Sequence, residues 1–591
     1  MTFRALTFLV AASVATLLVQ PADAARPLLR GKAAPAVQTA AQASVVDYPV
    51  YDSVVDPVTA AIRAALADAG TKGGFLDKRD AAGVADYYAE QGYTPVWTVD
   101  GKFSDQAKAI IARIKNAAED GLDPAQYPLP PAQLGEAMPA TAAAIAGYDV
   151  ELSDAIVTYA RHAHSGRLDP GDVSPNFAYK PRLLDPHDVL QTMVEASDVD
   201  AAMTGFSPHH PEFLALRAKL AEVRNQPHED QVIVPDGPTL KLGMSDPRVA
   251  LLRERLKIEA APVPSDPATT NATAATNAAA DPAAVAATTP AADPAAAADP
   301  NVYDKTVVAA VKAWQASAGL KADGMLGRGS LAALNRVPPD PVNTILVNME
   351  RWRWMADDLG RFYVRVNIPN FNLDIYRDGK VVYTTRIVVG QPDKQTPIFS
   401  DQIRIVDVNP TWNVPSSIAV KEMLPKLMAN PASLSQYQIF VNYNGRFQAV
   451  DPTQVDWSNV DMRRVQIKQP PGDDNALGSI KFLFPNPFAV YLHDTNSKSF
   501  FQRDYRALSH GCMRVQNPWD FASVLLAGEP NVSVGQLKSM VGGSERQIEL
   551  AHRIPVHITY FTAWVDDAGN LQLRDDLYGH DQHMEQMLGL S

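Results

Sequence analysis

The single cysteine of this 591-residue chain lies in the segment Ser509-His510-Gly511-Cys512-Met513-Arg514-Val515, and another histidine, His493, lies upstream. A thiol, an imidazole and a glycine at the point of attack are the components of a cysteine acyl-transfer site. A free thiol is little ionised at neutral pH, so it needs a base or a positive neighbour. His493 is the candidate base, because an unperturbed imidazole titrates at about pH 6.5.

The residues beside Cys512 have predicted roles of their own. Gly511 lets the backbone approach a substrate closely, so we expect its N–H and that of Cys512 to point at a developing oxyanion. Ser509 is expected to fix the loop by hydrogen bonding. Arg514 offers a fork of donors that suits a substrate carboxylate, with a structural salt bridge as the alternative.

The first residues predict export from the cytoplasm. Arg4 precedes an apolar run from Ala5 to Val19, and Ala22-Asp23-Ala24 has the pattern of a cleavage site, so residues 1–24 are predicted to be a signal peptide. An uncleaved membrane anchor is the alternative, although a bilayer span needs about 20 apolar residues. In an exported protein a solitary cysteine cannot form an intramolecular disulfide, which favours a chemical role for Cys512.

Charge and histidine spacing exclude other function classes. The formal net charge of −13 argues against a nucleic-acid partner. His162 with His164, and His209 with His210, lack a further ligand at a supporting spacing, so no metal site is predicted. No cofactor is predicted either.

Composition and periodicity predict a multidomain α+β protein. After a flexible leader at 25–47, helical spacing at 58–68, 105–119, 150–163 and 212–224 predicts a helical scaffold domain over 48–240. A small domain follows at 241–337, with a disordered Ala/Pro-rich insertion at 260–300. A mostly β catalytic domain is predicted at 341–566, with an insertion at 412–475 and a C-terminal extension at 567–591.

The small domain resembles the three-helix peptidoglycan-binding domain. The resemblance covers Asp246 to Asn335 and depends on the stretch AVKAWQASAGLKADGMLGRGSLAALN, with predicted helices at 248–257, 303–317 and 330–335. The Asp-Gly-x-x-Gly turn between Trp-Gln and the last helix is the distinctive part. A plain helical spacer is the alternative.

From about Pro341 the periodicity is expected to change to strands. Short runs rich in Val, Ile, Tyr and Phe predict strands at 362–368, 372–376, 381–389, 403–408, 480–484, 489–493 and 556–564. Asp378-Gly379 predicts a hairpin turn. Helices are expected at 417–429 and from Pro518, with Asn517 as N-cap and Asp520 in the first turn.

The spacing from His493 to Ser509-His510-Gly511-Cys512 resembles the signature of the L,D-transpeptidase (YkuD-type) catalytic domain. NPTWNVPSSIA, NALGSIKFLFPN and YLHDTNSKSFFQRDYRALSHGCMRV resemble the large periplasmic members, which carry a scaffold domain and a lid inserted in the catalytic domain. The resemblance implies a mixed-sheet sandwich, with Cys512 as nucleophile and His493 as general acid and base. It also implies that His510 shapes the site and that the second ring nitrogen of His493 bonds the backbone carbonyl of Asp494.

Other assignments at this site remain predictions or alternatives. The Asp494 carboxylate orienting His493, as in a Ser-His-Asp triad, is the less favoured alternative to its carbonyl. Arg514, Asn475 and Tyr491 are predicted to bind substrate. Residues 412–475 are predicted to be a lid that keeps water from a thioester, or an insertion that only extends the fold.

The implied function is a periplasmic cell-wall enzyme that acts on peptidoglycan stem peptides. Cys512 would attack the third residue of a tetrapeptide stem, release the terminal D-alanine and pass the acyl group to a diaminopimelate amine, which gives a 3→3 cross-link. Carbapenem-type β-lactams would acylate Cys512. L,D-carboxypeptidase hydrolysis, lipoprotein attachment to the stem and a non-catalytic wall-binding scaffold are the alternatives, and other cell-wall synthesis enzymes are candidate partners.

Overall fold

The computed structural model describes residues 56–72, 78–136, 140–226, 232–258, 299–318, 320–335 and 340–590. The predicted signal peptide, the leader and nearly all of the Ala/Pro-rich insertion lie outside the described residues. Of the helices in the described residues, none has the length and apolar character that a membrane span requires.

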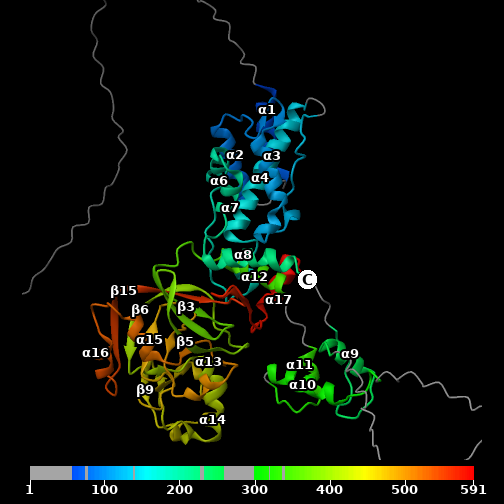
Figure 1. Ribbon diagram of the computed structural model, residues 1–591. Coiled ribbons are helices and arrows are strands. Elements are labelled where there is room, and N and C mark those ends of the chain that lie inside the picture. Colours follow the sequence, from blue (N-terminus) through cyan, green and yellow to red (C-terminus); the bar gives the residue numbers. More distant parts are fainter. Residues whose placement is uncertain are drawn as a thin grey trace, which may run out of the picture. The chain divides into compact units, whose positions relative to one another are not determined.

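A helical bundle forms the first described part (Figure 1). Its helices are α1 (Pro57–Lys72), α2 (Lys78–Glu90), α3 (Asp105–Lys115), α4 (Ala142–Ser165), α5 (Pro170–Val173), α6 (Pro186–Glu195), α7 (Val199–Gly205) and α8 (Pro211–Arg224), and a short hairpin joins β1 (Thr98–Val99) to β2 (Lys102–Phe103). The side chains of Ser104, Thr141 and Asp198 cap α3, α4 and α7 by accepting first-turn N–H groups. The predicted helical ranges are confirmed, and a 3-10 turn (Ala117–Asp120) follows α3.

A separate core unites α9 (Arg248–Arg255), α10 (Lys305–Ser317) and α11 (Arg328–Leu334). Buried Gln315 holds the Asp-Gly-x-x-Gly turn of this domain. Its side-chain amide donates to the Asp323 carboxylate at 3.1 Å, and its side-chain oxygen accepts the N–H of Gly324 at 2.8 Å. Val234 and Leu240 pack into the same core. The three predicted helices are therefore present.

Residues 341–353 form helix α12 (Pro341–Arg353), so the prediction of strands from Pro341 was wrong. The Asp340 side chain caps this helix by accepting the N–H of Val342. Every residue from Thr344 to Arg353 is buried, so the helix lacks the one-sided apolar pattern by which a surface helix is recognised in sequence. α12 packs on α8, and the strands begin only at Phe362.

In the described range 340–590 a nine-stranded mixed sheet has the order β13-β5-β14-β12-β11-β6-β15-β3-β4, and β4 also pairs with β5, so the sheet closes on itself. The strands are β3 (Phe362–Asn367), β4 (Asn372–Arg377), β5 (Lys380–Gly390), β6 (Ser400–Val408), β11 (Ile480–Leu483), β12 (Leu492–His493), β13 (Ala507–Ser509), β14 (Met513–Val515) and β15 (Arg546–Thr559). The mixed sheet of the predicted fold is confirmed.

Two local predictions for these strands have different outcomes. Asp378 and Gly379 both have positive φ, 48° and 76°, which makes the predicted tight hairpin turn between β4 and β5. The strand predicted at 489–493 begins only at Leu492, because Ala489 has a φ of 55°, outside the range of extended backbone.

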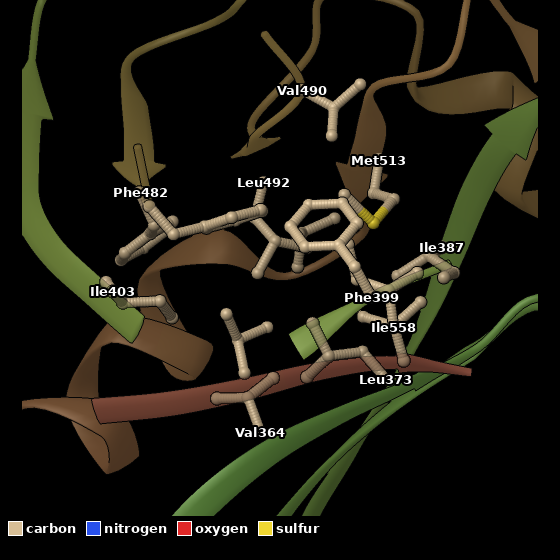
Figure 2. Close-up of a cluster of buried hydrophobic side chains, with 14 of the residues drawn as sticks. Val364, Leu373, Ile387, Phe399, Ile403, Phe482, Val490, Leu492, Met513 and Ile558 are labelled. Atoms are coloured by element: carbon tan, nitrogen blue, oxygen red, sulfur yellow. The ribbon is translucent and has the colours of Figure 1, made fainter. Parts of the chain in front are cut away.

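The closed sheet encloses a hydrophobic core (Figure 2). Side chains from β3, β4, β6, β11, β12, β14 and β15 meet there, among them Leu492 and Met513. Val173 and Phe177, which precede α6, join this core, as do Met584 and Leu588 of α17 (His580–Leu588). The segment predicted as a C-terminal extension thus helps to build the core.

Further helices and strands flank the sheet. They are α15 (Pro518–Leu525), α16 (Val534–Ser539), β16 (Ala563–Val565) and β17 (Leu571–Leu573). Asn517 is the N-cap residue of α15 as predicted, although it caps through its backbone carbonyl, which accepts the N–H of Phe521, and its side chain makes no capping hydrogen bond. Pro518 and Asp520 occupy the first turn as expected.

Residues 412–469 form an inserted subdomain with a core of its own. In this described stretch a four-stranded sheet has the order β7-β10-β8-β9. Its elements are β7 (Trp412–Asn413), α13 (Ser416–Ile418), a π-helical turn (Ala419–Met423), α14 (Leu424–Ala429), β8 (Gln438–Tyr443), β9 (Arg446–Ala449) and β10 (Val465–Gln469).

Candidate active site

Neighbouring parallel strands bring Cys512 and His493 together. Leu492 pairs with Met513 and His493 with Arg514 in the β12–β14 register. Leu492 and Met513 point into the core (Figure 2), so alternation places His493 and Cys512 on the opposite face of the sheet. Diagonal neighbours on one sheet face lie within reach when one side chain is an aromatic ring.

His493 is held in one orientation by its own chain. Its Nδ1 bonds the carbonyl oxygen of Asp494, which is the predicted contact, so Nδ1 carries the proton and Nε2 is the basic nitrogen. The Asp494 carboxylate instead accepts the N–H and hydroxyl of Ser479, each at 2.9 Å, and pairs with Lys498. The triad alternative is therefore not realised.

Burial keeps both reacting groups neutral. His493 is only 4% exposed, and this burial, helped by the Arg514 charge, lowers its pKa to about 3. Burial also raises the pKa of Cys512 to about 11, although the Tyr491 N–H and the Arg514 charge act in the opposite direction. The resting pair is thus a thiol beside a neutral imidazole.

Ser509 fixes the nucleophile loop, as predicted. Its hydroxyl donates to the carbonyl oxygen of Cys512 at 2.6 Å and accepts the N–H of Gly511 at 3.1 Å. Gly511 has a φ of 114°, a conformation that favours glycine. Because Ser509 occupies the Gly511 N–H, the prediction that this N–H points at an oxyanion is corrected. The N–H of Cys512 has no hydrogen-bond partner among the described residues and is the remaining candidate donor.

The inserted subdomain reaches the nucleophile loop through Glu422. This carboxylate lies on the π-helical turn, bonds Nε2 of His510 and pairs with Lys394 at 3.1 Å. His510 and Lys394 hold the pKa of Glu422 below its usual value despite a desolvation effect that raises it. Glu422 was not predicted from the sequence, because His510 is 88 residues away along the chain.

Tyr491 and Arg514 lie beside the reacting pair. The rings of Tyr491 and His493 are 5.6 Å apart in a T-shaped arrangement. Arg514 forms no ion pair with a described residue, its Nε is buried without a hydrogen-bond partner, and its guanidinium lies 5.6 Å from the ring of Phe500. The salt-bridge alternative for Arg514 therefore finds no support, and substrate binding by both residues stays a prediction.

A buried ion pair, missed in the sequence, adjoins His493. Lys481 is the strand partner of His493 and of Asp407, and its ammonium lies 3.0 Å from the Asp407 carboxylate. The ammonium is also 3.5 Å from Glu545 and 5.9 Å from the centre of the Tyr491 ring. Lys481 lies within the strand predicted at 480–484, but no role was predicted for it, and its position beside His493 follows from strand register.

Asn475 makes its contacts where the inserted subdomain joins the rest of the domain. It is 1% exposed, and its amide donates to the carbonyls of Pro410 at 3.0 Å and Pro470 at 2.8 Å, while its oxygen accepts the N–H of Leu477. These bonds join the entry and exit of the inserted subdomain. A substrate contact would have to displace them, so the structure corrects the predicted substrate-binding role toward a structural one.

Two of the histidines that were considered and set aside as metal ligands have other partners. His162 Nδ1 lies 3.2 Å from the Tyr127 hydroxyl, and His210 Nε2 lies 3.0 Å from the carbonyl oxygen of Ala356. Within the described ranges, no group of three or more His, Cys, Asp or Glu side chains has the arrangement of a metal site.

Three family models match separate parts of the sequence. A model described as "L,D-transpeptidase catalytic domain" matches residues 361–534, which include His493 and Cys512. The chain carries an L,D-transpeptidase catalytic domain. A model described as "Scaffold domain" matches residues 82–220, and one described as "Putative peptidoglycan binding domain" matches residues 293–334.

Individual proteins and solved structures are similar to parts of the chain. A "Putative L,D-transpeptidase" of Haemophilus influenzae is 32% identical over 241 residues, which are 41% of this chain and 48% of that protein. The chain thus spans about half the length of this curated relative. Among solved structures, an L,D-transpeptidase from Mycobacterium smegmatis is 13% identical, with a TM-score of 0.16, and the match covers 34% of this chain and 58% of that one. One from Xylanimonas cellulosilytica is 13% identical, with a TM-score of 0.15, and covers 55% and 99%.

Proposed function

We propose that this chain is a peptidoglycan L,D-transpeptidase that forms 3→3 cross-links between stem peptides through a thioester on Cys512. The observation that carries the proposal is the placement of Cys512 and His493 on one face of adjacent parallel strands, inside an L,D-transpeptidase domain. The peptidoglycan-binding and scaffold matches support a wall substrate. A wall substrate calls for an extracytoplasmic location, and residues 1–24 support export to the periplasm.

The first half of the reaction uses the neutral pair. As the sulfur of Cys512 attacks the carbonyl carbon of the third stem residue, the thiol proton passes to Nε2 of His493. The tetrahedral oxyanion is stabilised by the Cys512 N–H. When the intermediate collapses, the bond to the terminal D-alanine breaks, and His493 gives its proton to the leaving amine.

The second half transfers the acyl group. The side-chain amine of a diaminopimelate on another stem attacks the thioester and gives a proton to His493, which returns it to the sulfur. Arg514 is proposed to bind a stem carboxylate, since its charge has no acidic partner among the described residues. The inserted subdomain is proposed to act as the lid, because Glu422 ties it to the loop that bears Cys512.

Hydrolysis by water and attachment of a lipoprotein share the same acyl-enzyme and differ only in the acceptor. Incubation of the purified protein with a disaccharide-tetrapeptide, followed by mass spectrometry, separates cross-linking from hydrolysis. We expect a dimer shorter by one D-alanine than the sum of its two parents. Tripeptide as the only product indicates a carboxypeptidase, and unchanged substrate contradicts both activities.

The neutral resting pair predicts a particular pH dependence. His493 is neutral above about pH 4 because its pKa is lowered to about 3, so no acid limb is expected between pH 5 and pH 8. Below the raised pKa of Cys512, near 11, the thiolate fraction grows with pH. Alkylation of this sole cysteine by iodoacetamide should therefore accelerate by roughly tenfold per pH unit between pH 7 and pH 9. An alkylation rate that does not increase above pH 6 would mean that the resting pair is a thiolate and an imidazolium. Cys512→Ser is the control for labelling at other residues.

A further inference from the structure

A turn at residues 390–398 forms the wall behind the nucleophile loop. Thr396 is fully buried, and its hydroxyl donates to the carbonyl oxygen of Gly511 at 2.8 Å while accepting the N–H of Gly390 at 2.9 Å. The carbonyl oxygen of Gln395 lies 3.4 Å from the place that a Cβ on Gly511 would take. The carbonyl of Gly511 is therefore aimed at this wall.

Because the peptide unit between Gly511 and Cys512 is planar, the contact of the Gly511 carbonyl with Thr396 also sets the direction of the Cys512 N–H. The Gly511 carbonyl and the Cys512 N–H belong to one planar trans peptide unit, so they point in opposite directions. A carbonyl held toward Thr396 turns the Cys512 N–H away from the wall. That N–H is the oxyanion donor left after Ser509 takes the N–H of Gly511.

A segment of the scaffold region holds the turn from outside. The N–H of Ile398 donates to the carbonyl of Asn176 at 2.7 Å, and the N–H of Ala178 donates back to Ile398 at 2.9 Å. The Asn176 amide also donates to the side-chain oxygen of Gln395 at 2.9 Å. Buried Phe177 anchors the segment in the catalytic core.

The C-terminal part of the chain holds the same turn from another side. The hydroxyl of Tyr578 donates to the carbonyl of Gly390 at 2.7 Å and accepts the N–H of Thr396 at 3.2 Å. His580 lies two residues after Tyr578, and the centre of its ring is 4.8 Å from the centre of the Phe177 ring. Two segments far from Cys512 in sequence thus fix the position of Thr396.

We propose that Thr396 is a positioning residue that orients the Cys512 N–H toward the oxyanion, and that scaffold residues 174–178 hold it in place through Asn176 and Gln395. The inference rests on the proposed acyl-transfer function. An oxyanion exists only in the transition state and the intermediate, so a misdirected N–H lowers kcat and leaves KM nearly unchanged.

The test compares reactions that need an oxyanion donor with one that does not. In the full chain, Thr396→Val should lower D-alanine release from the tetrapeptide and acylation by p-nitrophenyl acetate by about 10- to 100-fold. Alkylation by iodoacetamide forms no oxyanion and should stay within about twofold of wild type. Thr396→Ser restores the hydroxyl and should recover most of both acyl-transfer rates.

Asn176→Ala should give the same pattern with a smaller loss of about threefold to tenfold. Asn225→Ala, which removes an exposed amide that bonds Ala221, is the matched control. If Thr396→Val slows alkylation as much as acylation, or if Thr396→Ser fails to recover, the orienting role is wrong. If Asn176→Ala behaves like Asn225→Ala, the scaffold contribution is wrong. Should Thr396→Val not fold, Gln395→Ala, which keeps the Thr396 hydroxyl, takes its place.

The reaction with p-nitrophenyl acetate tests the role of Thr396 independently of the proposed function. If wild type acylates with the ester but releases no D-alanine, the stem-peptide function fails, and the ester ratio between Thr396→Val and wild type still decides the positioning role.

Discussion

Replacement of Cys512 by serine is expected to lower D-alanine release from a tetrapeptide stem by more than about 1,000-fold. An alkoxide is far harder to form than a thiolate, and the neutral His493 is a weak base for a hydroxyl. A loss of 1,000-fold corresponds to about 4 kcal/mol of transition-state stabilisation. The rate is measured by quantifying free D-alanine.

The same variant carries its own control for folding. Serine is close to cysteine in size, so the thermal transition of Cys512→Ser should stay near that of wild type. A carbapenem should add its mass to wild type and not to the variant. If D-alanine release persists in Cys512→Ser, or if the carbapenem still adds to it, another residue is the nucleophile.

Replacement of His493 by glutamine is expected to reduce transfer by about 100- to 10,000-fold at pH 7, because the thiol then has no general base. Glutamine retains a donor for the carbonyl of Asp494, so the local backbone contact has a substitute. Iodoacetamide labelling at pH 10 should remain close to wild type, since solvent hydroxide forms the thiolate there.

This prediction is checked by comparing the pH profiles of D-alanine release for His493→Gln and wild type. The variant should gain activity steadily toward high pH. His510→Gln is the matched comparison, because it removes the nearer histidine in sequence and should cost less than His493→Gln. A larger loss of activity for His510→Gln than for His493→Gln would mean that His493 is not the general base.

The sequence predicted the strand that carries His493 and most of its neighbours, because strand periodicity and turns are local properties, but it did not predict the three-residue strands β13 and β14 on either side of Cys512. Asp378-Gly379 needs only its own backbone preference to make a hairpin, and the interval from His493 to Cys512 is visible in the sequence. α12 escaped prediction because burial on every side leaves it no polar face.

The supporting residues could not be predicted, because their contacts depend on how the chain closes. Thr396 reaches Gly511 across 115 residues, and Lys481 meets His493 only through strand register. Gly511 shows that contacts between residues close together in the sequence can be equally hard to predict. A close approach of the backbone was expected at Gly511, yet the direction of its N–H depends on the Ser509 hydroxyl that accepts it.

The core around the closed sheet includes Val173 and Phe177, which precede the sheet strands by well over a hundred residues, and Met584 and Leu588 near the C-terminal end of the described residues. A chain emerging from the ribosome makes the first pair long before the second, so this core cannot be completed during most of synthesis. The thiol of Cys512 is made 76 residues before Leu588, so it is expected to gain its neutral, partly buried environment only when the chain is nearly finished. Proteins cut short before residue 584 would carry Cys512 as an ordinary accessible cysteine, open to oxidation.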